Sequence, residues 1–136
     1  MLRKQVEEAI EKPLEKALYI FRRYGHPFCL IFLETSQPIE RDRLGIKLRK
    51  TDKLVEVDPS HHIIFLSLIG EREGGYKAAE NILTQLENKF PDIVFHIGVA
   101  CKNREEQEDI VTRIFYALSN AKDHDGNFVA DDYGID

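Results

Sequence analysis

Two adjacent histidines, His61 and His62, stand at the start of an apolar, β-rich segment. Histidine can ligate a metal ion or transfer a proton near neutral pH, so either kind of chemistry is conceivable for the pair. Adjacent side chains of a strand point to opposite faces of the sheet, and two such rings cannot converge on one ion. We therefore expect one exposed and one packed histidine rather than a metal site.

Glu34 and Lys122 are charged residues that adjoin apolar segments. A carboxylate such as Glu34 binds a divalent ion firmly only with several further ligands, and none adjoins it in the sequence. Lys122 falls near the end of a predicted helix, where the helix dipole favours a cation. From the residue types alone, both side chains are interpreted as solvated charges.

Residues 70–75, Gly-Glu-Arg-Glu-Gly-Gly, have the glycine content of a phosphate-binding loop. They lack the lysine that such a loop uses to reach the phosphates, so we predict an ordinary loop. The two cysteines, Cys29 and Cys101, are in neither a CxxC nor a Cys/His spacing, which gives no support for zinc. We expect two reduced, partly buried thiols in a reducing cytoplasm.

Apolar patterns predict the elements that position these residues. Spacing of three and four residues predicts a helix that begins at Pro13 and ends at Gly25, with residues 1–12 as an incoming connector helix. A hairpin with its turn at 58–60 joins two of five expected strands. These strands are residues 28–33, 53–57, 62–68, 92–99 and 128–130. Further helices are expected at 44–50, at 78–90 and after a capping box formed by Asn103 and Glu106.

The order of these elements predicts an α/β fold with one mixed central β-sheet and helices packed on it. The 136 residues suit one domain, 1–136. A net charge of −5 gives no support for a nucleic-acid or anionic-membrane surface. The longest apolar run, residues 28–33, is far too short to span a membrane, and the charged start has no signal-peptide core. We expect a cytoplasmic protein.

Four stretches, in order and in register, carry a resemblance to a known family: residues 22–34, 48–57, 95–100 and 117–127. Phe95-His-Ile-Gly-Val-Ala100 is similar to an "SIGVA" strand, and the stretch from Ala117 to Asn127 is similar to an "ALYxAKxxGRN" close. Together they resemble a GGDEF-type diguanylate cyclase domain. The resemblance implies a nucleotide-cyclase palm-like fold with a ferredoxin-like core.

The chain departs from this family at the hairpin tip that gives the family its name. Ser60 stands where a metal-binding carboxylate belongs, His61 replaces the catalytic glutamate, and Pro59 replaces a glycine. The segment before the tip is also shorter and lacks the "FKxxND" helix that recognises guanine. The resemblance therefore implies a vestigial active site without catalysis, metal or cofactor. Its residues are Glu34, Asp58, Ser60, His61 and Lys122.

Arg49 and Asp52 form an RxxD motif five residues before the tip, where the family binds cyclic di-GMP at an inhibitory site. An arginine fork can grip a phosphate or a guanine edge, and an aspartate accepts from guanine nitrogens. Lys77 is the one basic residue near the place of the family's further arginines. We predict a regulatory domain that binds cyclic di-GMP through Arg49, Asp52 and Lys77.

Two alternatives from other classes stay open. The first is a protein-interaction or dimerisation module without a nucleotide ligand, and the lowest-ranked is a residual nucleotide-processing enzyme. An exposed Arg49 that faces a second basic group would favour the receptor. A buried or salt-bridged Arg49 would favour the interaction module.

Overall fold

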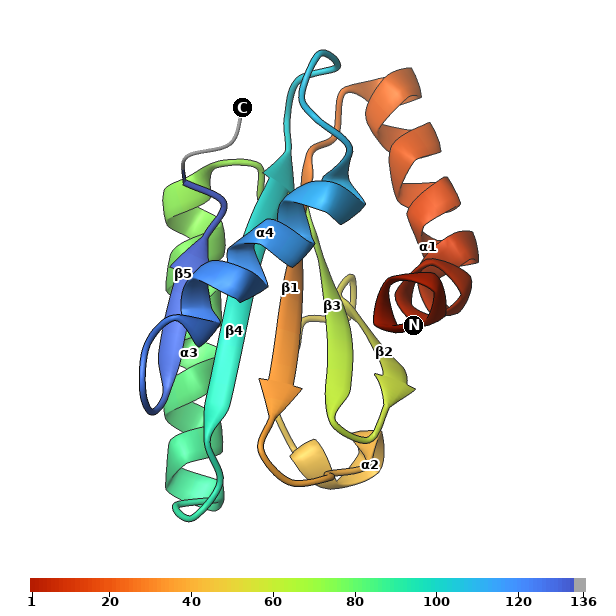
Figure 1. Cartoon of the computed structure of the whole chain (residues 1–136). Helices are drawn as coiled ribbons and strands as arrows, with labels where there is room; N and C mark the ends of the chain where they lie inside the picture. The colour runs from red at the N-terminus through yellow and green to blue at the C-terminus, as the bar shows by residue number, and fades with distance from the viewer. Residues whose placement is uncertain (134–136) are drawn as a thin grey trace.

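The computed structural model describes residues 1–133 as a five-stranded sheet with helices on both faces (Figure 1). The strands are β1 (Phe28–Thr35), β2 (Lys53–Asp58), β3 (His61–Ser67), β4 (Phe95–Lys102) and β5 (Phe128–Asp131). Their order in the sheet is β2-β3-β1-β4-β5, and only β4 and β5 are parallel neighbours. The predicted mixed sheet and the predicted β2–β3 hairpin are confirmed.

The helices are α1 (Leu2–Tyr24), α2 (Arg41–Leu44), α3 (Arg72–Lys89) and α4 (Ile110–Lys122). Helices α1 and α4 cover one face of the sheet, and α3 covers the other (Figure 1). Alternation along β1 separates the two cores: Ile31 and Leu33 face α3, whereas Leu30 and Phe32 face α1 and α4. Both faces of β1 are therefore buried, as its continuous apolar sequence predicts.

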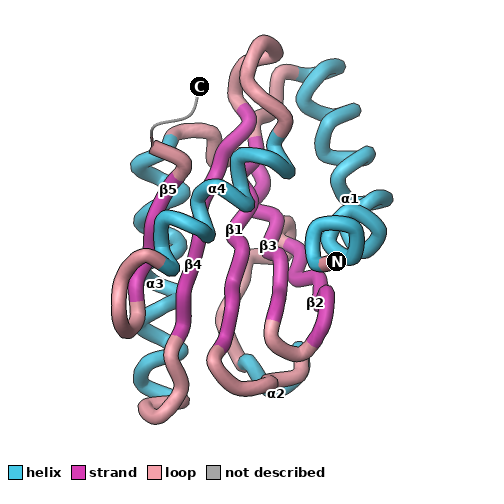
Figure 2. The backbone as a smooth tube through the Cα atoms, in the orientation of Figure 1, coloured by secondary structure: helices cyan, strands magenta, loops and turns pink. Residues whose placement is uncertain are grey.

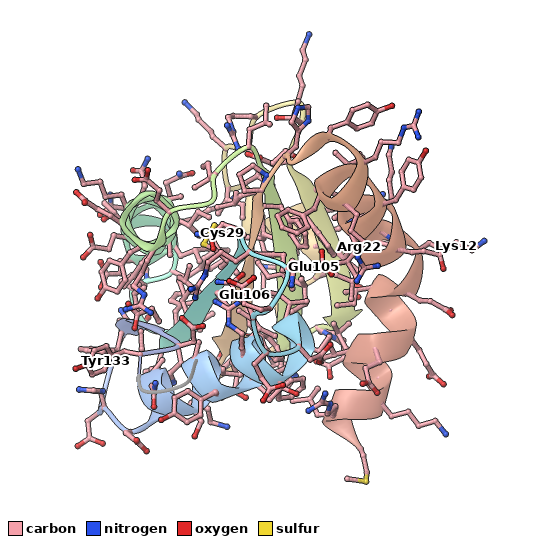
Figure 3. All side chains as sticks on the ribbon, turned by 90° about the horizontal axis from the view of Figure 1, so that it is seen from above. Lys12, Arg22, Cys29, Glu105, Glu106 and Tyr133 are labelled. Carbon is pink, nitrogen blue, oxygen red and sulfur yellow. A yellow bond between two sulfur atoms is a disulfide. The ribbon has the colours of Figure 1, made fainter. Side chains whose placement is uncertain are left out.

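Helix α1 differs from the prediction at its start. It is continuous from Leu2, and Pro13 lies inside it rather than at its first turn. A proline inside a helix removes one hydrogen bond and bends the axis, and the helix changes direction between its two halves (Figures 1 and 3). Val6 and Ile10, in the segment expected to be a connector, are fully buried. The first half of α1 thus belongs to the core.

Three further boundaries differ from the prediction. Residues 45–52 form a loop rather than a helix, and the only turn of helix is α2 before them (Figure 2). Helix α3 begins at Arg72, so Gly74 and Gly75 are helical rather than part of a loop. Helix α4 begins at Ile110, capped by the Asp109 side chain, which accepts from the Thr112 N–H. Asn103 therefore belongs to a loop and not to a capping box.

The prediction of two free thiols is also wrong. Cys29 and Cys101 face each other across β1 and β4 and form a disulfide, with both residues buried (Figure 3). Both cysteines lie in the core on the α3 side of the sheet, and the sequence alone does not reveal their cross-strand register. A Cβ on Gly75 would lie 3.1 Å from the Cys29 sulfur and 3.0 Å from the Cys101 sulfur, so this glycine lets α3 approach the disulfide.

Candidate functional site

The predicted vestigial site residues meet at one end of the sheet. Glu34 is the penultimate residue of β1, Asp58 ends β2, His61 begins β3, and Lys122 ends α4. Glu34 and His61 are direct partners across the β1–β3 pair, so the register alone sets them side by side. We call Glu34, Asp58, His61 and Lys122 the hairpin-tip cluster.

His61 bridges the two carboxylates of the hairpin-tip cluster. Its Nε2 lies 2.8 Å from Glu34 Oε2, and its Nδ1 lies 2.9 Å from Asp58 Oδ1. Lys122 Nζ lies 3.2 Å from Glu34 Oε1. Each ring nitrogen of His61 therefore has a carboxylate oxygen within hydrogen-bond distance, and the tautomer sets which nitrogen donates. The cluster is a connected chain of polar side chains in which His61 lies between the two carboxylates and Lys122 forms an ion pair with Glu34.

Asp58 also receives a main-chain donor, because the Ser60 N–H donates to its Oδ1 at 2.8 Å. Burial raises the pKa of Asp58, but the hydrogen bonds from His61 and from the Ser60 N–H outweigh it and hold the pKa below the ordinary value of 3.8. The half-buried Ser60 contributes its main chain to this turn, and its carbonyl accepts from the Thr35 N–H at 3.0 Å. The turn at the tip is therefore fixed from both sides.

Among the described residues, the hairpin tip has no set of side chains placed to bind a metal ion. Across residues 1–133, no group of three or more histidine, cysteine, aspartate or glutamate side chains is placed to hold a metal ion. At the hairpin tip, both nitrogens of His61 already face carboxylate oxygens, and Lys122 occupies the remaining side of Glu34. The arrangement suits mutual charge compensation.

His62, the neighbour of His61, is fully buried on the α3 side of the sheet. Neither ring nitrogen has a hydrogen-bond partner among residues 1–133, and the nearest carboxylate oxygen, on Glu56, is 3.6 Å from Nε2. Burial lowers the pKa of His62 below its ordinary value of 6.5, although the charges of Glu56 and Asp58 oppose this. The two histidines point to opposite faces as predicted, but His61 is bonded and half-buried rather than exposed.

Arg49 and Asp52, the RxxD pair, are brought together by a turn in the loop before β2. Arg49 Nη2 lies 2.9 Å from Asp52 Oδ1, and Arg49 Nε donates to Oδ2 at 3.2 Å. The Arg49 N–H also donates to Oδ2, and Nη2 donates to the Ser67 carbonyl at 2.7 Å. The Asp52 side chain is only 4% exposed, whereas that of Arg49 is 49% exposed. Arg49 therefore uses most of its donors within the protein.

Lys77, the third predicted ligand residue, lies on α3 and not at this turn. Its side chain is exposed, and its ion-pair partner is Glu73 of the same helix, at 3.7 Å. The structure thus joins Arg49 to Asp52 but shows no contact of Lys77 with either, among the described residues.

Sequence reasoning also missed a buried ion pair. Arg113 and Asp132 have side chains only 6% and 4% exposed, and Arg113 Nε donates to Asp132 Oδ2 at 2.7 Å. The available signal was the place of Arg113 between Ile110 and Ile114 on the apolar stripe of α4. An arginine on a buried stripe requires a charged partner.

Solved structures of GGDEF domains share this fold. The GGDEF domain of YfiN (TpbB) from Pseudomonas aeruginosa superposes with a TM-score of 0.70 at 16% identity, covering 90% of this chain and 92% of that chain. The GGDEF domain of DgcB from Caulobacter crescentus, in complex with c-di-GMP, gives a TM-score of 0.69 at 12% identity, covering 93% and 90%. A DGC protein from Thermotoga maritima gives 0.58 at 14% identity, covering 85% and 92%.

These likenesses confirm the predicted fold class, the mixed α/β architecture of the cyclase palm type. No protein-family model and no curated protein matches the sequence. None of the helices within residues 1–133 combines the length and the apolar character needed to cross a membrane. The chain therefore has the fold of a GGDEF domain, and its function must be argued from its own residues.

Proposed function

We propose that this chain is a non-catalytic signalling domain that acts by binding a partner. The observation that carries the proposal is the hairpin-tip cluster, in which His61 stands 2.8 Å from Glu34 and 2.9 Å from Asp58. Cyclisation of a nucleoside triphosphate needs carboxylates free to hold divalent metal. Here both carboxylates are engaged by an imidazole, Lys122 also neutralises Glu34, and the tip offers Ser60 in place of a further carboxylate.

The absence of cyclase activity is the first test. Purified protein incubated with GTP and Mg²⁺ or Mn²⁺ should give no cyclic product above a buffer control. Glu34→Gln removes the remaining family carboxylate, and Glu15→Gln on the exposed part of α1 removes one charge elsewhere as a matched control. Turnover that is lost in Glu34→Gln but kept in Glu15→Gln would overturn the proposal.

The partner is better described as a protein than as a dinucleotide. A ligand at the RxxD pair would have to replace the bonds from Arg49 to Asp52 and to the Ser67 carbonyl, the latter at 2.7 Å. Exchanging a hydrogen bond within the protein for one to the ligand contributes little net free energy to binding. We therefore favour a protein-interaction or dimerisation module. Light scattering across a concentration series tests whether the partner is a second copy of this chain.

Cyclic di-GMP binding is the second candidate function. It is favoured by the half-exposed guanidinium of Arg49, held beside a carboxylate, and by the bound c-di-GMP in the DgcB domain of the same fold. If it operates, Arg49→Ala should weaken binding by about one to two orders of magnitude, because charge-assisted contacts contribute about 1.5–3 kcal/mol each. Calorimetric titration measures this, with Lys47→Ala, an exposed residue in the same loop, as control. If no heat of binding is measured at about 100 μM ligand, only the interaction-module hypothesis remains.

A further inference from the structure

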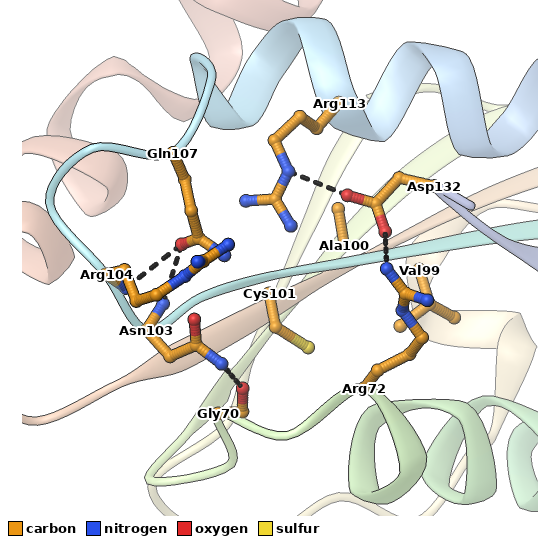
Figure 4. A pocket seen from close by; sticks show the side chains of 10 residues that line it. All are labelled: Gly70, Arg72, Val99, Ala100, Cys101, Asn103, Arg104, Gln107, Arg113 and Asp132. Atoms are coloured by element: carbon orange, nitrogen blue, oxygen red, sulfur yellow. Dashed lines mark hydrogen bonds and ion pairs between the residues drawn. The ribbon is translucent and has the colours of Figure 1, made fainter. Parts of the chain in front are cut away.

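An arginine-lined cavity lies at the opposite end of the sheet from the hairpin tip (Figure 4). Its volume is about 580 Å³. Arg72 comes from the start of α3, Arg104 from the loop after β4, and Arg113 from α4. The remaining lining is the end of β4 with parts of the neighbouring loops and of the chain end: Gly70, Val99, Ala100, Cys101, Asn103, Gln107 and Asp132. None of these residues belongs to the hairpin-tip cluster or to the RxxD pair.

Arg113 supplies an unused donor inside this cavity. Its side chain is only 6% exposed, and its Nε is bonded to Asp132 at 2.7 Å. Its Nη1 is buried and has no hydrogen-bond partner within residues 1–133. Figure 4 shows the guanidinium extending from α4 into the space between Gln107 and Asp132. A buried N–H without an acceptor is unfavourable, so a ligand oxygen at this place would be bound strongly.

Arg72 and Arg104 stand at the rim with side chains 53% and 63% exposed. Their ion pairs are long: Arg72 lies 3.6 Å from Asp131 and 3.9 Å from Asp132, and Arg104 lies 3.9 Å from Glu106. Ion pairs this long, with an exposed guanidinium, contribute little free energy. Both guanidinium groups can therefore turn toward an anion at small cost.

The loop that carries Arg104 is held in place by side-chain amides. Gln107 Oε1 accepts from the Asn103 N–H at 2.9 Å and from the Arg104 N–H at 3.1 Å. The Asn103 amide donates to the Gly70 carbonyl, which ties this loop to the segment before α3 (Figure 4). The backbone segments that carry the two rim arginines are thus held relative to each other before any ligand arrives, which lowers the entropic cost of binding.

We propose that this cavity binds the phosphate group of a small molecule. Three arginines and one aspartate among the lining residues leave two positive charges, which match a phosphate dianion. Guanidinium forks suit phosphate oxygens, with Arg113 Nη1 as the inner donor and Arg72 and Arg104 as the outer ones. The volume exceeds that of one phosphate and falls within the roughly 300–1,000 Å³ typical of small-molecule sites, so the phosphate is carried on a larger molecule.

Titration of the whole chain with inorganic phosphate, pyrophosphate and GTP tests this inference. We expect saturable one-to-one binding of pyrophosphate or GTP by calorimetry, with NMR shifts at the amides of Gly70, Asn103 and Gln107. Equal affinity for inorganic phosphate would identify the free anion as the ligand, and a tighter GTP complex would identify a carried phosphate. Failure of all three probes to bind at about 5 mM, an affinity too weak for a built site, would overturn the proposal.

Three variants locate the binding. Arg113→Lys keeps a cation for Asp132 but replaces the guanidinium fork, and with it Nη1, by a single ammonium, and should weaken binding about tenfold or more. Arg104→Gln should weaken it about three- to tenfold, without an effect on folding because the residue is exposed. Arg41→Gln is the control: Arg41 is also exposed, it lies on α2 at the far end of the molecule, and the variant removes the same charge. If Arg41→Gln weakens binding as much as Arg104→Gln, the attraction is general and the proposed site is wrong. If Arg113→Lys does not fold, Arg104→Gln and the NMR shifts decide.

Discussion

The two ends of the sheet differ in how far their charged side chains are paired with partners inside the protein. At the hairpin tip, Glu34 and Asp58 share His61, so that each carboxylate has a ring nitrogen within 2.9 Å. At the other end, Arg113 has one nitrogen paired and another without an acceptor among residues 1–133. The first arrangement engages both carboxylates within the protein, and the second leaves a donor for a ligand.

His62 leads to a prediction about acid stability. Burial lowers its pKa below 6.5, so the folded protein resists a proton that the unfolded chain accepts at its ordinary pKa. The stability contributed by neutral His62 is fully present above pH 6.5 and is lost as pH falls below it, with a slope of up to about 1.4 kcal/mol per pH unit. His62→Phe replaces the imidazole with a somewhat larger aromatic ring that does not titrate, and should abolish this slope.

Urea unfolding between about pH 5 and pH 7.5 measures this slope through the linkage of proton binding to unfolding. His26→Phe is the matched control, because His26 is exposed and should leave the pH dependence unchanged. Asp58 does not confuse the result: its pKa lies below 3.8, so its contribution is lost only at more acidic pH. Parallel curves for the wild type and His62→Phe would show that His62 is not the source.

At the residue scale, the sequence predicted which side chains gather at the tip but not how they bond. Resemblance placed Glu34, Asp58 and His61 at adjacent strand ends, and the β1–β3 register confirms that placement. The bridging role of His61 depends on its rotamer, which neighbouring packing decides. The role of Arg113 was missed because its partner, Asp132, follows β5. The sequence does not show that the chain after β5 comes back beside Arg113.

Contact between α4 and β4 depends on one position without a side chain. A Cβ on Gly98 would lie 2.5 Å from the Leu118 nitrogen and 2.9 Å from the Ala117 carbonyl carbon. Both are backbone atoms, so no side-chain rotation can relieve the clash. The glycine of the "SIGVA"-like strand therefore sets how closely α4 packs on the sheet, and α4 carries both Lys122 and Arg113 to their sites.

Gly98→Ala should consequently destabilise the protein by about 1–3 kcal/mol, the usual cost of overpacking a rigid contact. Thermal and urea unfolding measure this loss. Gly74→Ala in α3 is the control: its nearest neighbour is a methyl of Ile69 at 3.2 Å, and alanine is the better helix former by up to about 1 kcal/mol. An equal loss in both variants would refute the specific role of the α4 backbone.

Strands were predicted better than helix ends, for a physical reason. A strand buried on both faces leaves a continuous apolar run such as residues 28–33, whereas helix ends depend on local bonds that compete. Asn103 has the type of a helix cap, but its side chain donates to Gly70 and α4 starts after Asp109 instead. Gly75 breaks a helical pattern in sequence, yet it is helical here because α3 packs on the disulfide.

At the scale of the whole molecule, exposed polar side-chain contacts join α1 to the region around α4, which lies far from it in the sequence. Arg3 donates to Thr112 at 3.0 Å and Arg22 pairs with Glu105 at 3.3 Å, so α1 is held to the region around α4 at both of its ends (Figure 3). These contacts are exposed and individually weak. Cooperative unfolding must therefore depend mainly on the two apolar cores that share β1, and on the covalent link between β1 and β4.

The disulfide gives a prediction for the stability of the whole chain. Cys29 and Cys101 are 72 residues apart, and closing a loop of this length in the unfolded chain stabilises the folded state by up to about 4 kcal/mol. Reducing agent should therefore lower the melting temperature of the wild type, whereas the double variant Cys29→Ala, Cys101→Ala should melt lower and not respond to it. Thiol titration in denaturant should find no free thiol before reduction and two after it, because the chain has only these two cysteines. Two free thiols before reduction would instead support the cytoplasmic, reduced protein expected from the cysteine spacing, with Cys29 and Cys101 packed as small apolar side chains beneath Gly75.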